Sequence, residues 1–520
     1  MQLTNDKLPG NLEELKAIIL TKDEIIHSKD EHITILEEQI RVLKKAIFGK
    51  KSEKRPVEDQ GAEQQLHLFN EPEALIEQEA QQKLVVAEHT RQKPKRKPLP
   101  KDLPRVEVIE DIDESEKVCA CGAALSRIGE EICEKLDIIP AKIRVIRIIR
   151  PKYACKNCEG VESEGAAVKI APPPPQIIPK GIATPGLVAH IAISKYADAL
   201  PLYRQEKIFA RYGIDLTRST MAGWMVMAAQ SCRPVMELLY EKLLSGPLIN
   251  VDETPVQVIK EPGRANTTKS YMWVFRGGPP EKPVIVYRYS PTRSGEIPKE
   301  VLQGYRGYCQ TDAFSGYDGL EAAIPGIILV GCFAHVRRNF VNVIDARGKA
   351  AKNKTGSAEI ALNYIGRLYR IEKIARERGF SPEEIVSVRR EQAQPVLTEF
   401  KAWMDKRIDQ TPPKGLVGQA LGYAITQWPR LIRYLENGHI TPDNNLAENA
   451  IRPFVIGRKN WLFAGSPSGA DAAATLYSLI ETAKVCGLDP YYYFRTLFEK
   501  LPYASSEAEY SALLPQNFTL

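Results

Sequence analysis

The pattern of apolar runs between residues 246 and 345 constrains the fold of this chain more than any other feature. The third and fourth runs are separated by a segment typical of a helix, residues 295–303. Three strands in succession, followed by helix, strand, helix and strand, predict a mixed sheet whose later strands are joined through helices. The expected strands are residues 247–259, 269–277, 283–290, 307–311 and 327–332.

Two acidic residues stand at strand positions in this pattern. Asp252 lies in the first strand, within PLINVDETPVQV, and Asp312 closes the fourth, within RGYCQTDAFSGY. The order of elements matches a ribonuclease-H-like α/β core, which carries carboxylates at these two places. A third acid is expected on a later helix, and Glu448 in NNLAENAIR fits that position.

Three converging carboxylates favour a pair of divalent cations, Mg²⁺ or Mn²⁺, because hard cations prefer oxygen ligands. Two such cations activate a nucleophile and stabilise the leaving oxygen of a phosphodiester. Other interpretations stay open for the single acids. An Asp at a strand end is commonly a turn or cap residue, Glu448 also fits a capping box with Asn445, and Asp443 is an alternative ligand.

Basic residues lie near these acids in the sequence. Arg452, Arg458 and Lys459 follow Glu448, and Arg338 follows His335 in the segment CFAHVRR. Because cations repel metals, these groups are expected to contact DNA phosphates. His335 is interpreted either as a hydrogen-bonded structural residue or as a catalytic or phosphate-contacting one.

The stretch between Asp312 and Glu448 is too long for a compact core. It is predicted to be a helical insertion, because Leu362, Ile365 and Leu368 recur at helical spacing. The resulting division is a catalytic core over 246–345 and 440–465, an insertion over 346–439 and a C-terminal helical segment over 466–520.

Four cysteines are spaced like metal ligands. Cys119 and Cys121 form one pair, Cys155 and Cys158 a second, and alternating apolar residues at Ile143, Val145 and Ile148 predict strands between the pairs. This arrangement is typical of a zinc ribbon, here residues 111–165, with four thiolates on one structural Zn²⁺. The first pair is spaced more closely than the usual C-x-x-C, so unligated thiols are the alternative.

The N-terminal region is expected to serve assembly and DNA contact. Residues 11–48 carry Ile and Leu at heptad spacing, which favours a parallel two-stranded coiled coil over a helix packed on its own protein. Residues 49–110 are interpreted as a linker with a basic arm, where Pro alternates with Lys and Arg and favours extended backbone along DNA. The DNA contacts are expected at Lys95, Arg96 and Lys97.

A helical region is predicted over residues 180–245. It contains a helix at 202–212, a turn at Gly213 and a second helix capped by Thr217 or Ser219. The pattern indicates either a helix-turn-helix, whose second helix enters the major groove, or an ordinary helical hairpin.

The length of 520 residues predicts several domains, so the fold class is multidomain α+β. The N-terminus lacks a signal peptide, and no apolar run reaches the roughly 20 residues of a membrane span. A cytoplasmic protein without membrane contact is expected.

Several segments together resemble the insertion sequence 66 family of DDE transposases. The family's catalytic segments are similar to VDETP, TDAFSGY, GCFAHVRRNF and NNLAENAIRPFVIGRKNWLFAGS, and its earlier segments to AIFGKKSEK, RKPLPKDLPR, CACGAAL…YACKNC and KYADALPLYRQEKIF. The resemblance implies a DDE triad of Asp252, Asp312 and Glu448. Many DDE enzymes carry a Lys or Arg seven residues after the Glu, where this chain has Val455.

The resemblance further implies an enzyme that cuts and rejoins the ends of a bacterial insertion sequence. Its partners would be DNA of the element ends and of the target, further copies of itself in a homodimer or higher oligomer, and helper proteins encoded by the element. It would associate with the nucleoid during action. The alternative is a catalytically silent DNA-binding protein or repressor, which would keep the coiled coil and the zinc ribbon.

The paired cysteines generate the first testable prediction. Metal analysis of the isolated segment 108–165 should find about one zinc per chain, because a closed four-thiolate site holds one ion and supplies the folding energy that a small core lacks. A segment that folds well without metal would contradict the zinc site.

Overall fold

A computed structural model describes residues 143–154, 168–347 and 356–518, together with scattered positions of an N-terminal helix between residues 13 and 41. The chain divides into two compact units, one of residues Gln65–Pro173 and one of residues Met1–Gln64 with Pro174–Leu520. The four cysteines predicted to bind zinc and the basic arm at residues 95–97 lie outside the described residues.

The smaller unit contains a two-stranded antiparallel ribbon, β1 (Lys152–Ala154) and β2 (Val168–Ile170). The two strands flank the segment of the chain that carries the second cysteine pair. The prediction of strands at Ile143, Val145 and Ile148 was wrong, because residues 143–150 form no regular structure and these side chains are 47%, 95% and 60% exposed. Apolar alternation produces a strand only where a partner strand and a core are available.

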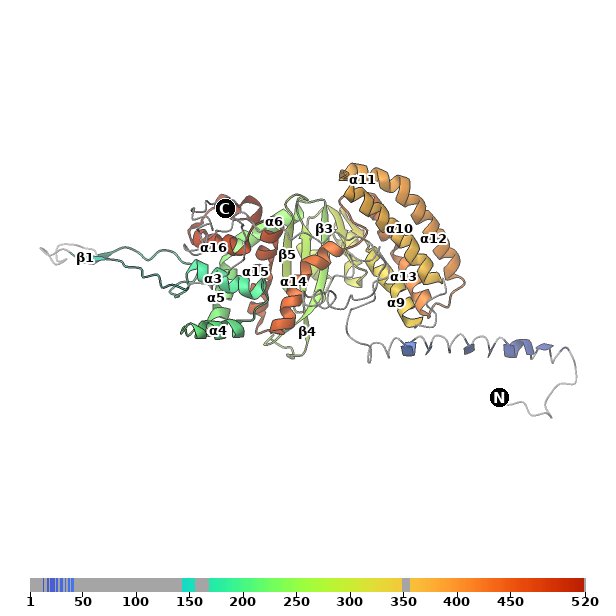
Figure 1. The fold of residues 1–520 in the computed structure, drawn as a ribbon, viewed down its shortest axis with the longest axis horizontal. Coiled ribbons are helices and arrows are strands. Elements are labelled where there is room, and N and C mark those ends of the chain that lie inside the picture. The colour runs from blue at the N-terminus through green and yellow to red at the C-terminus, as the bar shows by residue number, and fades with distance from the viewer. Residues whose placement is uncertain are drawn as a thin grey trace, which may run out of the picture. The chain divides into compact units, whose positions relative to one another are not determined.

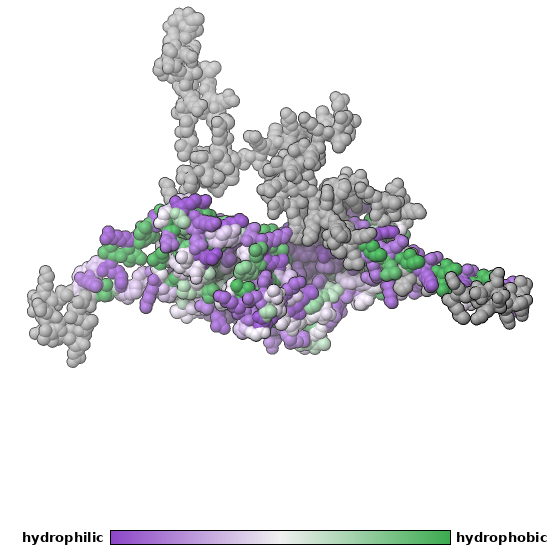
Figure 2. Space-filling model, turned by 90° about the horizontal axis from the view of Figure 1, so that it is seen from below, coloured by the Kyte–Doolittle hydropathy of each residue, from purple (hydrophilic) through white to green (hydrophobic). Residues whose placement is uncertain are grey.

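The N-terminal helix exposes its apolar seam. Ile19, Ile26, Ile33 and Ile40 are half exposed, and their spacing of seven residues places them on one face of the helix. Figure 2 shows hydrophobic and hydrophilic residues mixed over the visible surface. The described positions agree with a helix, and the coiled-coil pairing stays a prediction.

The larger unit is built on a six-stranded sheet of order β5-β4-β3-β6-β7, with β8 (Phe463–Ala464) beside the end of β3. β3 (Leu248–Val258), β4 (Lys269–Gly277) and β5 (Val284–Ser290) pair antiparallel. β6 (Gly307–Gln310) and β7 (Ile327–Val330) run parallel to β3 and follow crossovers that contain α7 (Glu296–Val301) and α8 (Leu320–Ala323). The predicted strands and the mixed sheet are confirmed.

Helices cover the sheet from two sides (Figure 1). One group belongs to the same apolar core as β3, β4 and β5, and the second packs around β7. The first group comprises α3 (Pro185–Tyr196), α4 (Leu202–Arg211), α5 (Arg218–Ser231), α6 (Arg233–Leu244), α14 (Asn445–Trp461), α15 (Pro467–Val485), α16 (Pro490–Lys500) and α17 (Glu507–Ala512). The second comprises α9 (Phe333–Arg347), α10 (Ser357–Glu377), α11 (Pro382–Val388), α12 (Gln394–Ile408) and α13 (Leu416–Leu431), which confirms the helical insertion.

The edge strand β5 is protected by hydroxyl groups of α15. Ser478 Oγ accepts a hydrogen bond from the N–H of Tyr287 at 2.7 Å, and Thr482 Oγ1 accepts one from Ile285 at 3.0 Å and donates to the Ile285 carbonyl. These contacts satisfy backbone groups that an edge strand would otherwise leave unpaired. They fix α15 along the sheet.

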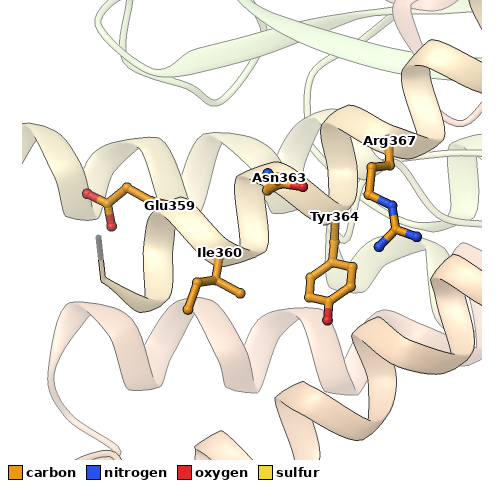
Figure 3. Close-up of a pocket in the computed structure, with 5 residues that line it drawn as sticks. All are labelled: Glu359, Ile360, Asn363, Tyr364 and Arg367. Carbon is orange, nitrogen blue, oxygen red and sulfur yellow. The ribbon is translucent and has the colours of Figure 1, made fainter. Parts of the chain in front are cut away.

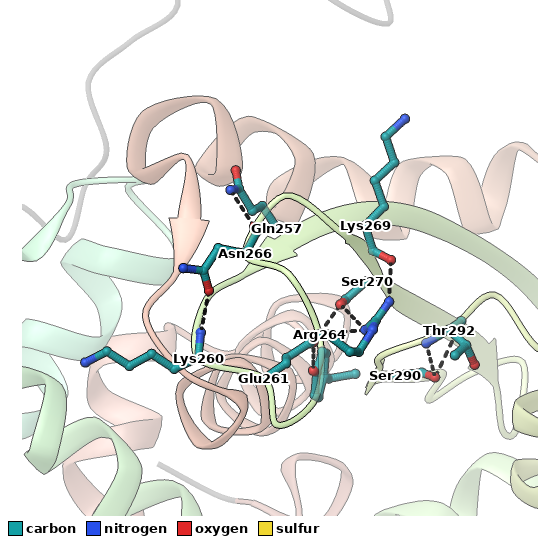
Figure 4. Close-up of polar contacts among 10 residues, drawn as sticks. Gln257, Lys260, Glu261, Arg264, Asn266, Lys269, Ser270, Ser290 and Thr292 are labelled. Carbon is teal, nitrogen blue, oxygen red and sulfur yellow. Dashed lines mark hydrogen bonds and ion pairs between the residues drawn. The ribbon is translucent and has the colours of Figure 1, made fainter.

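The turn between β3 and β4 is held by one buried acid, Glu261 (Figure 4). Glu261 accepts hydrogen bonds from Ser270 Oγ at 2.6 Å and from the guanidinium of Arg264. Asn266 closes the same turn through the Lys260 N–H at 3.0 Å and the Gln257 side chain at 2.8 Å. This end of the hairpin is therefore a structural cluster.

The predicted pair of helices before the sheet is present. α4 ends at a turn with Gly213 at φ +74°, and the side chain of Thr217 caps α5 by accepting the Thr220 N–H. Met221, Trp224 and Met225 of α5 are buried, whereas Arg218 and Ser219 at its start are exposed. A role of this pair in reading DNA stays a prediction. None of the described helices is both long and apolar enough to cross a membrane.

A fully buried arginine fastens the helical insertion to the segment before α14. Arg389 donates to both carboxylate oxygens of Glu372 at 2.7 and 2.8 Å. It also donates to the main-chain carbonyls of Tyr434, Asn437 and Ile440 at 2.6–2.8 Å. All five N–H groups of the guanidinium are thereby used.

Replacing this arginine should strongly destabilise the protein. Arg389→Met leaves a buried glutamate and three carbonyls without partners, so we expect the free energy of unfolding to fall by about 3–5 kcal/mol. Chemical denaturation measures the loss. Arg367→Met is the matched control, because Arg367 also pairs with a glutamate, Glu399, but at the surface, where such pairs contribute at most about 1 kcal/mol. Equal losses in the two variants would contradict the structural role of Arg389.

Candidate acidic active site

Asp252 and Asp312 lie at equivalent places on neighbouring parallel strands. β3 and β6 pair in a register that sets Asn250 opposite Gln310, and each aspartate follows two residues later. Because the strands are parallel and adjacent, both aspartates lie at the same level along the two strands, Asp252 within β3 and Asp312 just after β6. The strand pattern predicted this placement.

Each aspartate is oriented by one backbone hydrogen bond. Asp252 Oδ1 accepts from the N–H of Glu253 at 2.8 Å, and Asp312 Oδ1 accepts from the N–H of Phe314 at 2.9 Å. In the described part of the chain, the second oxygen of each carboxylate accepts no hydrogen bond. These two oxygens are free to take up a ligand.

Glu448 joins the two aspartates from the first turn of α14. Its carboxylate is 12% exposed and lies 3.9 Å from Nη2 of Arg338 on α9. The helix starts after Asn444, whose side chain makes no cap hydrogen bond, and Glu448 is the fourth residue of the helix rather than the third. The capping-box interpretation of Glu448 is therefore wrong.

The alternative acid, Asp443, is used by the backbone. Its Oδ1 accepts the N–H of Asn445 at 3.2 Å, and its carbonyl accepts a hydrogen bond from the Thr441 hydroxyl. The side chain is 8% exposed. Burial raises the pKa of Asp443, and the hydrogen bond from Asn445 opposes that shift. This acid shapes the start of α14, so Glu448 is the better candidate of the two.

A buried network of amides fixes the elements that carry the acids. Asn250 on β3 donates to Gln310 on β6 at 2.9 Å and to Asn444 before α14 at 3.1 Å. Asn444 donates to the Val251 carbonyl at 2.8 Å, and Gln310 to the Thr441 carbonyl at 2.7 Å. The network joins the strands of Asp252 and Asp312 to the helix of Glu448.

The charges of the acids influence one another. Burial raises the pKa of Asp252 well above its usual range, and the negative charges of Glu253, Glu448 and Asp312 raise it further. Burial also raises the pKa of Glu448, where Asp443 and Asp312 add to the shift and Arg338 and Arg452 oppose it. A site in which carboxylates repel one another favours the binding of a cation.

The donor set fits a hard divalent cation, because all three groups offer carboxylate oxygens. Within the residues that the structure describes, however, no three His, Cys, Asp or Glu side chains are close enough together to hold a metal ion. Binding by all three acids would therefore require at least one side chain to move inward.

Cys332 and His335 lie at the start of α9 beside these acids. The thiol of Cys332 accepts the N–H of Asn444 at 3.2 Å, and burial raises its pKa to about 12, so it stays neutral. Burial and the charge of Arg338 lower the pKa of His335, and Asp312 opposes the shift. Nδ1 of His335 is buried without a hydrogen-bond partner in the described part of the chain. The lowered pKa favours the neutral imidazole.

The four predicted phosphate-contacting cations occupy different positions. Arg338 faces Glu448 and is 58% exposed. Arg458 donates to Thr254 Oγ1 on β3 at 3.0 Å and so ties α14 to the strand of Asp252. Arg452 donates to Asn449 within its own helix at 2.6 Å, and Lys459 is exposed. Arg338 is therefore placed to form an ion pair with a candidate acid.

A second cluster beside the acids was missed by sequence reasoning. Glu253 is almost fully buried, and it accepts hydrogen bonds from Arg293, which follows β5, and from the hydroxyl of Tyr317. The guanidinium of Arg293 lies 3.7 Å from the ring centroid of Phe314. The one signal in the sequence was the acid directly after Asp252.

The structure also contains a surface cavity of about 380 Å³ on the helical insertion (Figure 3). It is lined by residues of α10, and Ile360 and Tyr364 point toward neighbouring helices. None of the candidate acids lines it. The acidic site is thus separate from this cavity.

Comparison with known proteins identifies the class to which this fold and site belong. Residues 180–472 match the model of the transposase IS66 family, residues 116–159 the zinc-finger binding domain of that transposase, and residues 478–516 its C-terminal element. Residues 35–108 match a model described as transposase C of IS166 homeodomain. The chain belongs to the IS66 family of insertion-sequence transposases, whose domains include DNA-binding modules.

Relatives of similar length occur in Sinorhizobium fredii. The uncharacterized protein y4jD is 35% identical over 81% of both chains. The uncharacterized protein y4qI is 33% identical over 82% of this chain and 79% of its own, and y4hP is 32% identical over 78% and 74%. The family resemblance inferred from the motifs is confirmed.

The amide network yields a stability prediction. Asn444→Ala removes the acceptor of Asn250 and the donor of the Val251 carbonyl in a buried setting, so the free energy of unfolding should fall by about 2–3 kcal/mol. Asn517→Ala is the matched control, because Asn517 is exposed and donates to the Ser511 carbonyl. Its loss should stay within about 0.5 kcal/mol in the same denaturation experiment. Equal stabilities of the two variants would contradict the network.

Proposed function

We propose that this protein is a DDE transposase that binds the ends of a bacterial insertion sequence and catalyses metal-dependent strand cleavage and strand transfer on DNA. The observation that carries the proposal is the grouping of Asp252, Asp312 and Glu448. Three separate elements bring them near enough for Asp312 and Glu448 to raise the pKa of Asp252, although the described side chains do not form a complete metal cluster. Surface carboxylates without a shared role would not require a buried amide network to bring them together.

The topology of the sheet supports the same proposal. Three antiparallel strands followed by two parallel ones, in the order β5-β4-β3-β6-β7, fit a ribonuclease-H-like core. In that core the acids stand on the first strand, after the fourth strand and on a later helix, as they do in this chain. The helices α9 to α13 are then an insertion between the second and third acid.

Asp252, Asp312 and Glu448 would hold two Mg²⁺ or Mn²⁺ ions. Bound there, the ions would activate a water molecule or a 3′-OH as nucleophile and stabilise the leaving oxygen. The residues of the chain orient the substrate. Arg338 is placed to contact a phosphate beside Glu448, and His335 lies one turn earlier on the same helix with its Nδ1 buried.

The remaining parts of the chain would find and pair the DNA. Cys119, Cys121, Cys155 and Cys158 would bind one structural Zn²⁺, and Lys95, Arg96 and Lys97 would contact phosphates. The exposed seam of the N-terminal helix would pair with a second copy, which would bring two element ends together. Helper proteins of the element and action at the bacterial nucleoid in the cytoplasm belong to the same proposal.

One observation favours the alternative of a catalytically silent DNA-binding protein. The described acids do not form a ready metal cluster. An inactive copy would bind the element end with normal affinity and would leave its strands intact in Mg²⁺, so a cleavage assay on wild type decides between the two functions.

The catalytic role of the acids is tested with Asp252→Asn and Glu448→Gln. Each variant keeps the shape of the side chain and removes a charged metal ligand. Strand cleavage of element-end DNA should fall by about 10³-fold, because metal ions contribute several kcal/mol to the transition state. Binding of the same DNA and thermal stability should be retained.

Glu300→Gln is the matched control, because Glu300 is an exposed acid paired with Arg288 away from the candidate site. Its cleavage rate should equal that of wild type. A Glu448→Gln enzyme that cuts and joins DNA at the normal rate in Mg²⁺ would remove Glu448 from the triad.

A further inference from the structure

Arg293 occupies an unusual place for a surface cation. It lies in the loop between β5 and α7 and donates from Nε to Glu253 Oε1 at 2.7 Å. A second donor, Nη2, is directed to the same oxygen. The arginine side chain is 39% exposed, whereas that of Glu253 is 1% exposed. One side of the guanidinium is therefore held by a buried acid and another faces solvent.

The guanidinium contacts one residue near each aspartate. Glu253 follows Asp252 in β3. The ring centroid of Phe314 lies 3.7 Å from the guanidinium carbon, and the N–H of Phe314 donates to Asp312. Stacking on the ring and a bond to a buried carboxylate together fix the plane of the guanidinium. A cation is thus fixed against the residue that follows Asp252 and the residue two positions after Asp312.

The donors of Arg293 are only partly used. A guanidinium carries five N–H groups, and two of them point to Glu253. The others have no acceptor among the described residues. A fixed, planar and partly exposed set of donors matches phosphate oxygens, which arginine binds through parallel hydrogen bonds. Arginine stays protonated at any pH at which the protein is folded, so this capacity does not depend on titration.

We propose that Arg293 binds a phosphate of the DNA strand that enters the acidic site, with Glu253 and Phe314 as the residues that position it. This inference rests on the proposed function, since it places the DNA backbone at the edge formed by Asp252 and Asp312. The competing explanation is that Arg293 only neutralises the buried Glu253. The two explanations differ in one respect. Only under the first does the contribution of Arg293 to DNA affinity depend on the charge of one particular phosphate.

The test combines protein variants with neutral phosphates. Duplexes spanning the end of the insertion sequence that encodes this chain carry one methylphosphonate each, scanned across the junction on both strands. Binding by the full chain is measured with Ca²⁺ in place of Mg²⁺. When the contacted phosphate is neutralised, the affinity of wild type for the duplex should fall about tenfold, whereas that of Arg293→Gln should fall less than about twofold. Neutralising phosphates at other positions should weaken binding of Arg293→Gln as it does that of wild type. On unmodified DNA the variant should bind about five- to tenfold more weakly, and the slope of log K against log salt should shift by about one.

Arg288→Gln is the matched control. Arg288 is 43% exposed and pairs with Glu300, so it shares the charge, exposure and partner type of Arg293 but has no contact with the acidic site. It should keep the full methylphosphonate profile of wild type. Arg293→Lys provides a second variant should the glutamine form unfold, and it should regain part of the affinity, since it keeps the charge without the planar fork.

The outcomes separate the inference from the proposed function. An Arg293→Gln profile identical to wild type at every phosphate would overturn the inference, even if wild type cleaves DNA in Mg²⁺. A lost phosphate contact in a protein that does not cleave DNA would support the inference and refute the catalytic proposal. A fall in thermal stability without any change in the profile would assign Arg293 to Glu253 alone.

Discussion

The buried hydrogen bonds among Asn250, Gln310 and Asn444 are the constraint on which the candidate site depends. They join residues as far as 194 positions apart, on the three elements that carry the candidate acids. Leaving a buried amide without its hydrogen bond costs about 1–3 kcal/mol. A shift of β6 along β3, or of α14 along the sheet, would break several of these bonds and incur that cost for each. Packing of apolar side chains alone would tolerate such shifts more easily, because it is not directional. The amides therefore set the distances among the acids, and the apolar core supplies the stability that holds them there.

The helical insertion is mechanically connected to this network. Arg389 binds the carbonyls of Tyr434, Asn437 and Ile440, and the chain then reaches Asn444 within a few residues. Arg433 continues the connection, since it donates to the Leu329 carbonyl of β7 at 2.7 Å. The segment that delivers Glu448 is thus held by the insertion on one side and by the sheet on the other. A region that interrupts the core in sequence consequently helps to place its third acid.

Sequence reasoning succeeded where local pattern decides the structure. Apolar runs predicted all five main strands, Thr217 and Gly213 predicted the boundary between α4 and α5, and the spacing of Leu362, Ile365 and Leu368 predicted α10. It failed where a distant partner decides. Residues 143–150 alternate like a strand, but among the described residues no strand pairs with them, and nothing in the sequence near Asn444 indicates a bond to Asn250. Arg293 escaped notice for the same reason, because its partner Glu253 comes from another strand 40 residues away.

If DNA binds at the acids as proposed, their charges give a role to an arginine on each side. Asp252, Asp312 and Glu448 repel one another, and a DNA strand adds further negative charge. Metal ions between the acids would compensate the centre of the site but not its margins, where the flanking phosphates must pass. Arg338 on α9 stands beside Glu448, and Arg293 stands beside Asp252 and Asp312, so each margin holds one guanidinium. Each is paired with a carboxylate, which keeps it in place before DNA arrives and lowers the entropy lost on binding. On this proposal Glu253 has a physical reason to be acidic and buried: a neutral residue there would leave Arg293 free to swing into solvent, away from the phosphate that it would bind.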